Sequence, residues 1–275
     1  MHDRVAWPYL TVQALSASPA GAEPLCGDFA SDGKIVALAC RDGVARAFNA
    51  SSGKAVSSFR SERASFGTAA CALAFHKGRN VAAVGNTAGE IWYWHVTARR
   101  PLMPTPLTQE GSAPAAVTFS PDASYFASAS TEGALRLYDA NLFVQTALLD
   151  GGADSNNCGH SNRAFAVGFV GESATVCVTA GWDGRAVLWD ARAGGAVASA
   201  HGSHVCGQAL DASRGETEVI LGSWREADAL QVRGTLRMRV VRSAERSQCS
   251  DPAQLTPRLA RGRYGTSVRG MRRAQ

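Results

Sequence analysis

His160 and Asp183 are placed where their side chains could meet near the middle of the chain. His160 precedes two strand-like runs, 164–170 and 175–180, and Asp183 follows them. If the runs pair as antiparallel strands, the imidazole can bridge the Asp183 carboxylate and the Thr179 hydroxyl, with a nitrogen facing the Trp189 indole. A histidine held by a carboxylate also suits acid–base catalysis, so the group has a catalytic and a structural interpretation.

The elements that must position these residues are three consecutive strands. Asp183 and Gly184 form the turn between the second and third strands, because Gly tolerates positive φ and Asp bonds its own backbone. The third strand ends at Trp189 and Asp190. A polar network buried in such a sheet must satisfy its own hydrogen bonds and then fixes the fold. The structural interpretation is therefore favoured over the catalytic one.

The segment 159–190 resembles the WD-repeat (WD40) β-propeller family. It opens with the dipeptide Gly-His and closes with Trp-Asp, the two signatures of that family. In the family, the His, Ser or Thr, Asp and Trp form a structural network inside one four-stranded blade. The resemblance implies this role for four residues: His160, Thr179, Asp183 and Trp189.

The spacing of this segment recurs along the chain. A phenylalanine that ends a first strand is followed by a turn glycine 14, 14, 14 and 15 residues later, and by an aromatic residue 19, 19, 19 and 20 residues later. The turn glycines are 44 to 51 residues apart, close to the roughly 40 to 45 residues of a four-stranded blade. The recurring positions are Phe29, Phe75, Phe119 and Phe169; Gly43, Gly89, Gly133 and Gly184; and Phe48, Trp94, Tyr138 and Trp189.

The repeats predict an all-β chain with a WD40-like propeller over 1–232. We expect four clear four-stranded blades, a decayed fifth and an N-terminal half-blade. The ring is expected to be incomplete, since the family's usual ring has seven blades, and a closed five-bladed ring is the alternative. The half-blade indicates either that both termini share one sheet or that an upstream part is missing. The units are 1–15 (partial), 25–59, 70–107, 115–149, 160–200 and 205–232 (partial).

Two of the units depart from the family pattern. The first has Phe48 and Asn49 in place of Trp-Asp. The third has Ser128, Glu132 and Tyr138 at network positions but no histidine ahead of them. The third network is therefore expected to be incomplete.

The second and fifth units carry further expectations. Trp92 and Trp94 should point to one face of their strand and Tyr93 to the other, between blades; a stacking platform for a nucleic-acid base is the alternative. The segment 99–114 contains four prolines and is expected to be an irregular connection. In the fifth unit we expect strands at 205–211 and 219–223.

Composition excludes several other classes of protein. No stretch approaches the roughly 18 apolar residues of a membrane span, and the first 30 residues lack a secretion signal. The seven cysteines include no Cys-x-x-Cys pair, which favours free thiols in a reducing compartment. His201, His204 and Cys206 are close in sequence, but no second cluster completes a metal site. We expect an intracellular protein, cytoplasmic or nuclear, without membrane association, metal or cofactor.

The last 43 residues have a different composition. Residues 233–275 contain 11 Arg, no Lys and two acids, a net charge of +9, against −4 for residues 1–232. An arginine-rich segment can bind phosphates or an acidic partner. The abrupt change also fits a shifted reading frame. We expect a disordered tail, because the segment is highly charged and has few apolar residues.

The resemblance implies a non-catalytic scaffold that binds other proteins, as an adaptor or a subunit of a larger complex. Association with nucleic acid through the tail is the alternative function. No inward Asp, Glu or His recurs from repeat to repeat, so an enzyme is not expected. In the family, the loops before the first strand and those between the second and third strands share one face, often the binding one, and the loop 150–162 is expected there too. On that face we place Arg41, Thr87, Thr131, Trp182, Trp224 and Arg225, with Trp182 and Arg225 as anchors. Trp182 could instead cover the adjacent blade.

Overall fold

The computed structural model describes residues 22–61, 67–109, 111–150, 159–202, 204–213, 218–224 and 229–234. All regular structure in these ranges is β-strand. No helix in them is long and apolar enough to cross a membrane. The expected half-blade at 1–15, the tail beyond 234 and Arg225 lie outside the described residues.

The strands form five antiparallel sheets, each built from consecutive strands of the chain. We call these sheets blades 1 to 5. Blade 1 contains β1 (Pro24–Phe29), β2 (Ile35–Cys40), β3 (Val44–Asn49) and β4 (Ala55–Arg60); blade 2 contains β5 (Ala70–Phe75), β6 (Val81–Asn86), β7 (Glu90–His95), β8 (Arg100–Pro101) and β9 (Leu107–Thr108). Blade 3 contains β10 (Pro114–Phe119), β11 (Tyr125–Ser130), β12 (Leu135–Asp139) and β13 (Val144–Leu149); blade 4 contains β14 (Ala164–Phe169), β15 (Val176–Gly181), β16 (Arg185–Asp190) and β17 (Gly195–His201); blade 5 contains β18 (Leu210–Ala212), β19 (Glu218–Gly222) and β20 (Leu230–Gly234).

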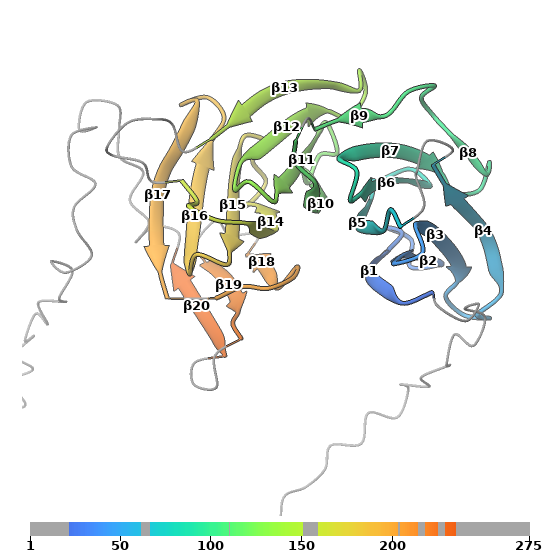
Figure 1. Ribbon diagram of the computed structural model, residues 1–275, viewed down its shortest axis with the longest axis horizontal. Coiled ribbons are helices and arrows are strands. Elements are labelled where there is room, and N and C mark those ends of the chain that lie inside the picture. The colour runs from blue at the N-terminus through green and yellow to red at the C-terminus, as the bar shows by residue number, and fades with distance from the viewer. Residues whose placement is uncertain are drawn as a thin grey trace, which may run out of the picture.

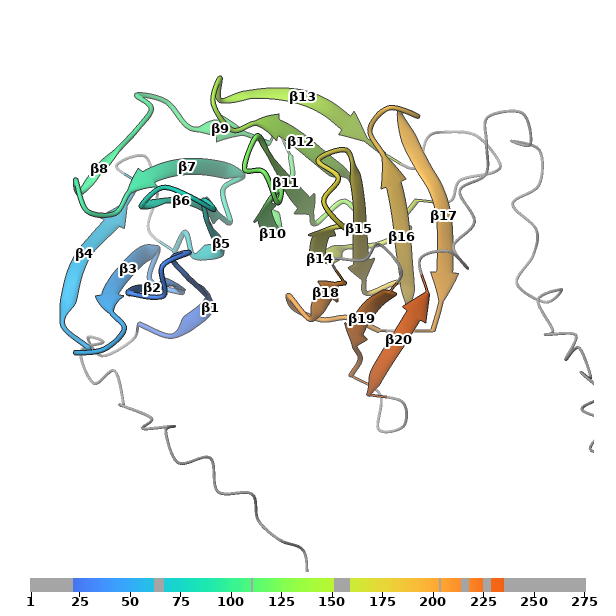
Figure 2. The same cartoon turned by 180° about the vertical axis from the view of Figure 1, so that it is seen from behind.

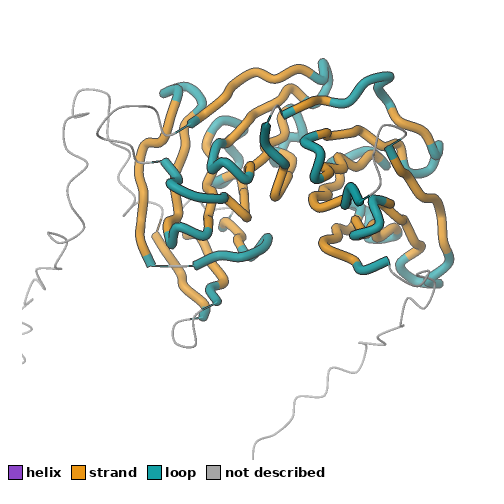
Figure 3. Tube along the Cα trace, in the orientation of Figure 1, coloured by secondary structure: helices purple, strands orange, loops and turns teal. Residues whose placement is uncertain are grey.

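The blades are arranged side by side in an open arc (Figure 1). The first strand of each blade lies on the inside of the arc and the last strand on the outside, and Figure 2 shows the same order from behind. The described residues leave the arc open between blade 1 and blade 5 (Figure 3). This confirms the predicted propeller architecture with an incomplete ring.

The predicted turn glycines adopt the backbone conformation that the spacing requires. Gly43, Gly89, Gly133 and Gly184 follow the second strands of blades 1 to 4 and have φ of +82°, +85°, +85° and +72°. Only glycine adopts such angles without a steric penalty. The repeated glycine therefore marks the same tight turn in each blade.

Apolar side chains fill the space between neighbouring blades. Ala37, Ala83 and Ala127 lie at equivalent positions of the second strands and are fully buried against the next blade. Their small side chains leave room for the large aromatic residues of that next blade. Trp94 and Tyr138, for example, are almost fully buried in the clusters on either side of blade 2.

The three aromatic residues of β7 divide between the two faces of blade 2 as predicted. Trp92 and Trp94 lie 5.8 and 6.1 Å from Phe59 of blade 1, between ring centroids. Tyr93 points the other way and lies edge-on to Phe143 of blade 3, at 4.6 Å. Because Trp92, Tyr93 and Trp94 are all buried, they belong to the core and offer no platform for a base.

A β-bulge recurs in the innermost strands of blades 1 to 4. In each strand one residue near the start is skipped in the pairing with the second strand. The extra residue bends the strand and resets its alternation of side chains. The skipped residues are Leu25, Cys71, Ala115 and Phe165.

Two expected elements differ in the structure. The segment 99–114 is not wholly irregular, because β8 and β9 both pair with β7 and replace one continuous outer strand. Its prolines lack the amide that a continuous ladder needs. The predicted strand 205–211 is wrong except at its end, where β18 begins at Leu210. Gly207 has a φ of +124°, and the Ala209 amide bonds the Gly207 carbonyl, which turns the chain.

Candidate functional site

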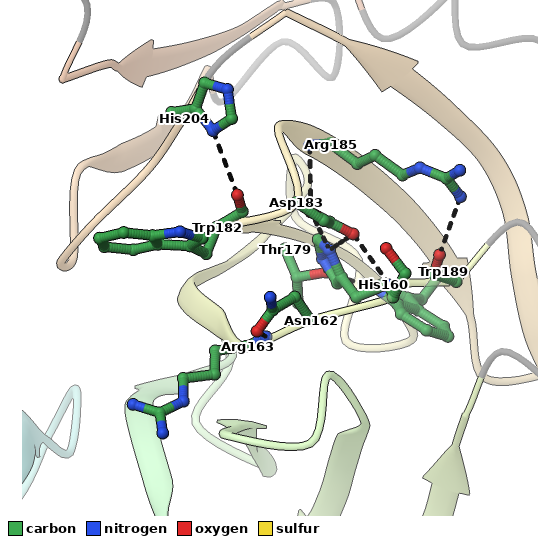
Figure 4. A network of polar contacts seen from close by, with 11 residues as sticks. His160, Asn162, Arg163, Thr179, Trp182, Asp183, Arg185, Trp189 and His204 are labelled. Carbon is green, nitrogen blue, oxygen red and sulfur yellow. Dashed lines mark hydrogen bonds and ion pairs between the residues drawn. The ribbon is translucent and has the colours of Figure 1, made fainter.

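The polar group of blade 4 is assembled by β15, β16 and the loop before β14 (Figure 4). His160 Nδ1 lies 3.0 Å from Asp183 Oδ1, and His160 Nε2 lies 2.7 Å from Thr179 Oγ1. The Trp189 indole Nε1–H donates to the same hydroxyl, at 2.7 Å. The imidazole therefore faces a carboxylate and a hydroxyl, and the indole bonds the hydroxyl rather than the imidazole.

One set of donors and acceptors satisfies the whole group. Trp189 donates to Thr179, the Thr179 hydroxyl donates to His160 Nε2, and His160 Nδ1–H donates to Asp183. This assignment gives a neutral histidine protonated on Nδ1. Each side-chain polar atom of this four-residue network then has a partner, as a buried network requires.

The surroundings of Asp183 favour the charged form of its carboxylate. Burial acts to raise the pKa of Asp183, but the hydrogen bonds from His160 and from the amides of Ser161 and Arg185 outweigh it, so the pKa lies below its usual value. The aspartate thus joins the loop before β14 to the turn after β15. That connection closes the end of the blade.

Burial argues against catalysis by this group. Thr179, His160 and Asp183 are aligned as a hydroxyl, an imidazole and a carboxylate, the order found in hydrolytic triads. The His160 side chain is 0% exposed and that of Asp183 is 4% exposed. No substrate can reach the Thr179 hydroxyl, because it already lies between the imidazole and the indole.

Blade 3 has a related network that the sequence analysis missed. Gln109 Nε2 donates to Ser128 Oγ at 2.8 Å and to Tyr138 OH at 3.0 Å. The expected gap ahead of Ser128 and Tyr138 is therefore filled by a buried glutamine in place of a histidine. Glu132 does not join these residues and instead lies 3.9 Å from Arg136.

The five described residues of the predicted binding face occupy equivalent places. Each lies in the turn between the second and third strands of its blade, and its backbone amide donates to a carbonyl oxygen in the loop before that blade's first strand. The pairs are Arg41–Glu23 (2.8 Å), Thr87–Ala69 (2.9 Å), Thr131–Ala113 (3.0 Å), Trp182–Arg163 (3.0 Å) and Trp224–His204 (3.0 Å). The turns therefore lie at one end of the sheets and are held there by the backbone.

The two tryptophans are the exposed large apolar side chains of this set. Trp182 is 53% exposed and Trp224 is 80% exposed. His204 links them, because its ring Nδ1 lies 3.1 Å from the Trp182 carbonyl while its own carbonyl accepts the Trp224 amide. Phe165, the bulge residue of β14, lies 6.0 Å from Trp182 between ring centroids. We call Phe165, Trp182, His204 and Trp224 the tryptophan edge.

The side chains of the other described residues of the set make contacts within the chain. Arg41 is exposed and forms an ion pair with Glu23 at 2.9 Å. The hydroxyls of Thr87 and Thr131 accept the amides of Ala69 and Ala113. These side chains support the turns, and they leave the tryptophan edge as the main apolar surface of this end.

His201 ends β17 of blade 4, and His204 and Cys206 lie in the segment before β18. Within the described ranges, no three His, Cys, Asp or Glu side chains are placed to hold an ion. His204 is used in the turn contact with Trp182. A loop role for His204 follows from this geometry.

A hollow of about 630 Å³ lies inside the arc. The innermost strands β1, β5 and β10 line it, with Asp28, His76, Lys77 and Gln208 as polar members. Gln208 Nε2 donates to the Val117 carbonyl, so the loop before β18 reaches blade 3. The sequence did not indicate this hollow, because its lining depends on how far the blades close around the axis.

Comparison with known proteins agrees with the geometry. The family WD domain, G-beta repeat matches residues 107–139. No curated protein sequence gives a match. Among 1492 matching chains of solved structures, a chain of "Crystal Structure of Mitotic Checkpoint Complex" is 18% identical with a TM-score of 0.66, and the match covers 80% of this chain and 65% of that chain.

The fold and the buried networks define a β-propeller protein whose blades are joined in an open arc. Residues 107–139, which include Gln109 and most of blade 3, match the repeat itself. The chain therefore has a WD40-like propeller fold, and residues 107–139 match a WD40 repeat.

Proposed function

We propose that the chain is a non-catalytic scaffold that binds other proteins through the tryptophan edge, as an adaptor or as a subunit of a larger complex. The observation that carries the proposal is the exposure of Trp182 and Trp224, 53% and 80%, on turns fixed by backbone hydrogen bonds. Tryptophan is enriched among the residues that dominate binding energy at protein interfaces. A fixed surface also loses little conformational entropy on binding.

Trp182 has a second interpretation, in which it covers the adjacent blade. Its ring lies against Phe165 of its own blade. Half of the side chain nevertheless remains open to solvent. Trp224 has the larger exposed fraction, and we propose it as an anchor beside Trp182 and Arg225.

The cellular location is part of the proposal. The described cysteines Cys26, Cys40, Cys71, Cys177 and Cys206 are free thiols. Free thiols are typical of a reducing compartment. We propose the cytoplasm or the nucleus.

The test compares proteins retained from an extract of the source cells. The full chain is immobilised as the wild type, as Trp182→Ala/Trp224→Ala and as Leu142→Ala, and retained proteins are quantified by mass spectrometry. Leu142 is the matched control because it is 71% exposed and lies in the hairpin between β12 and β13, away from the tryptophan edge. We expect that some proteins are retained by both the wild type and Leu142→Ala but are not retained by the double variant.

A quantitative arm uses one retained protein after purification. Loss of a central tryptophan costs about 2 kcal/mol or more at a binding hot spot, so affinity should fall at least about 30-fold. Equal affinity for the wild type and the double variant would refute this face. Adding Arg225→Ala tests the third anchor.

A further inference from the structure

Blade 5 exposes an apolar face on the side away from blade 4. Ile220 of β19 is 44% exposed, and Leu230 and Val232 of β20 are 69% and 56% exposed. Ile220 pairs with Val232, and Leu230 lies opposite Gly222 in the same pairing. The three side chains therefore share one face of the sheet, which we call the blade 5 face.

The same positions are buried in all four other blades. The equivalents of Ile220 are 0% exposed, those of Val232 are at most 3% exposed, and those of Leu230 are at most 1% exposed. In order, they are Ala37, Ala83, Ala127 and Val178; Ala47, Tyr93, Leu137 and Leu188; and Ala45, Ile91, Leu135 and Ala186. In blades 1 to 4 these positions pack against the next blade. The blade 5 face thus has the composition of a blade interface but is open.

Blade 1 exposes the complementary half of such an interface. Phe29 is 59% exposed, whereas its equivalents Phe75, Phe119 and Phe169 are 4%, 2% and 8% exposed. Those three pack against the preceding blade. Val36 and Leu38 lie on the same side of blade 1 and are half-buried. We call these three residues the blade 1 face.

We propose that the blade 5 face of one copy of this chain docks against the blade 1 face of a second copy. The contact continues the interface that already joins each blade to the next within the chain. At every boundary between two blades of the chain, a face equivalent to the blade 5 face packs against a face equivalent to the blade 1 face. One chain carries both halves, and both are apolar, so a second copy can cover them without a new kind of contact.

The symmetry of this contact makes a specific prediction. It is a heterologous, head-to-tail contact, because two different surfaces meet. A variant that has lost either face can no longer pair with itself, but it still carries the other face. Two variants with opposite defects can therefore pair once with each other and no further.

The experiment measures the molar mass of the full chain by light scattering over a concentration series. The wild type should exceed the monomer mass of 28.8 kDa, and Phe29→Asp and Ile220→Glu/Val232→Glu should each remain monomeric. A charge buried in an apolar interface without a partner is costly, so each variant should lose association. An equimolar mixture of the two variants should form a one-to-one pair of twice the monomer mass.

Controls and contrary outcomes complete the test. The substituted side chains are exposed, so each variant should keep the wild-type circular dichroism spectrum and unfolding midpoint. Leu142→Asp, on an exposed hairpin outside both faces, should associate like the wild type. A monomeric wild type would overturn the proposal. That is the result expected if another segment of the same chain covers the two faces. Association unaffected by Phe29→Asp, or a mixture that stays monomeric, would also overturn it.

Discussion

Gly133 of blade 3 lies against His160 of blade 4. A Cβ added to Gly133 would stand 2.9 Å from the His160 Cβ and 2.7 Å from the Asn162 carbonyl oxygen. The turn glycines of the neighbouring blades make the same kind of contact with the next blade's loop, at Thr68, Gln109 and His204. The polar residue ahead of each first strand is therefore held between its own blade and the turn of the blade before it.

Replacing Gly133 by alanine should destabilise the protein. A non-glycine residue at φ +85° costs about 1–2 kcal/mol, and the contact with Asn162 and His160 adds to that cost. Urea unfolding followed by tryptophan fluorescence measures the loss. Gly78→Ala is the matched control, because a Cβ there meets nothing within 4 Å, and its unfolding free energy should change by no more than about 1 kcal/mol.

The blade 4 network should depend strongly on the Thr179 hydroxyl. Thr179→Val keeps the shape of the side chain but leaves the Trp189 indole and His160 Nε2 without their shared partner. Each buried unsatisfied group costs about 1–3 kcal/mol, so the free energy of unfolding should fall by at least about 2 kcal/mol. Thr97→Val, on an exposed turn, should change it by less than about 0.5 kcal/mol. If Thr179→Val and Thr97→Val changed the free energy of unfolding equally, the Thr179 hydroxyl would make no special contribution to stability.

Gln109 should matter to blade 3 as His160 does to blade 4. Gln109→Leu removes the amide that bonds Ser128 and Tyr138 in a buried site. We expect a loss of about 1–3 kcal/mol in chemical denaturation. Gln145→Leu on the exposed outer strand β13 provides the comparison and should be close to neutral. If Gln109→Leu were as harmless as Gln145→Leu, the glutamine would be a packing residue only.

The stabilisation from Asp183 should disappear in acid. Its pKa in the folded protein lies below the value of about 3.9 expected for the unfolded chain. Ionised Asp183 therefore adds stability that is complete above about pH 3.9 and is lost as pH falls through the folded pKa. Unfolding midpoints of the wild type and Asp183→Asn, measured between pH 7 and pH 3, should converge as the pH falls. A constant difference would contradict the assignment.

The inner thiols should resist alkylation while the protein is folded. Burial raises the pKa of Cys26 to about 12 and that of Cys71 to about 11, so little reactive thiolate forms at neutral pH. Iodoacetamide at pH 7.5, followed by peptide mass spectrometry, should label these residues far more slowly than in urea. Rapid labelling in the folded state would show that the inner strands open readily.

The sequence predicted the blades because their spacing reflects local requirements. Gly133 and the three other turn glycines need positive φ, and an aromatic residue stands five residues after each of them, in the third strand. The group around His160 was predicted for the same reason, since all four members have the residue types that the family uses. Local rules therefore fixed both the turns and the best-preserved network.

Features that depend on contacts between blades could not be predicted in this way. Gln109 was missed because its role is defined by the neighbouring strands and not by its residue type. The division of the blade 2 outer strand into β8 and β9 depends on which amides remain free among the prolines. The prediction of a strand at 205–211 was wrong because the backbone turns at Gly207, although the residues around it follow an apolar pattern.

The bulges at Leu25, Cys71, Ala115 and Phe165 divide each innermost strand into a part that pairs regularly with the second strand and one residue that does not. Beyond the bulge, the strand's side chains must fit the neighbouring sheets, so their sizes are constrained. At the bulge itself the residue is freed from that pairing, and four very different side chains occupy it. Substitutions at Leu25, which is 49% exposed, can therefore change the surface of the arc while the packing that holds the sheets together stays the same.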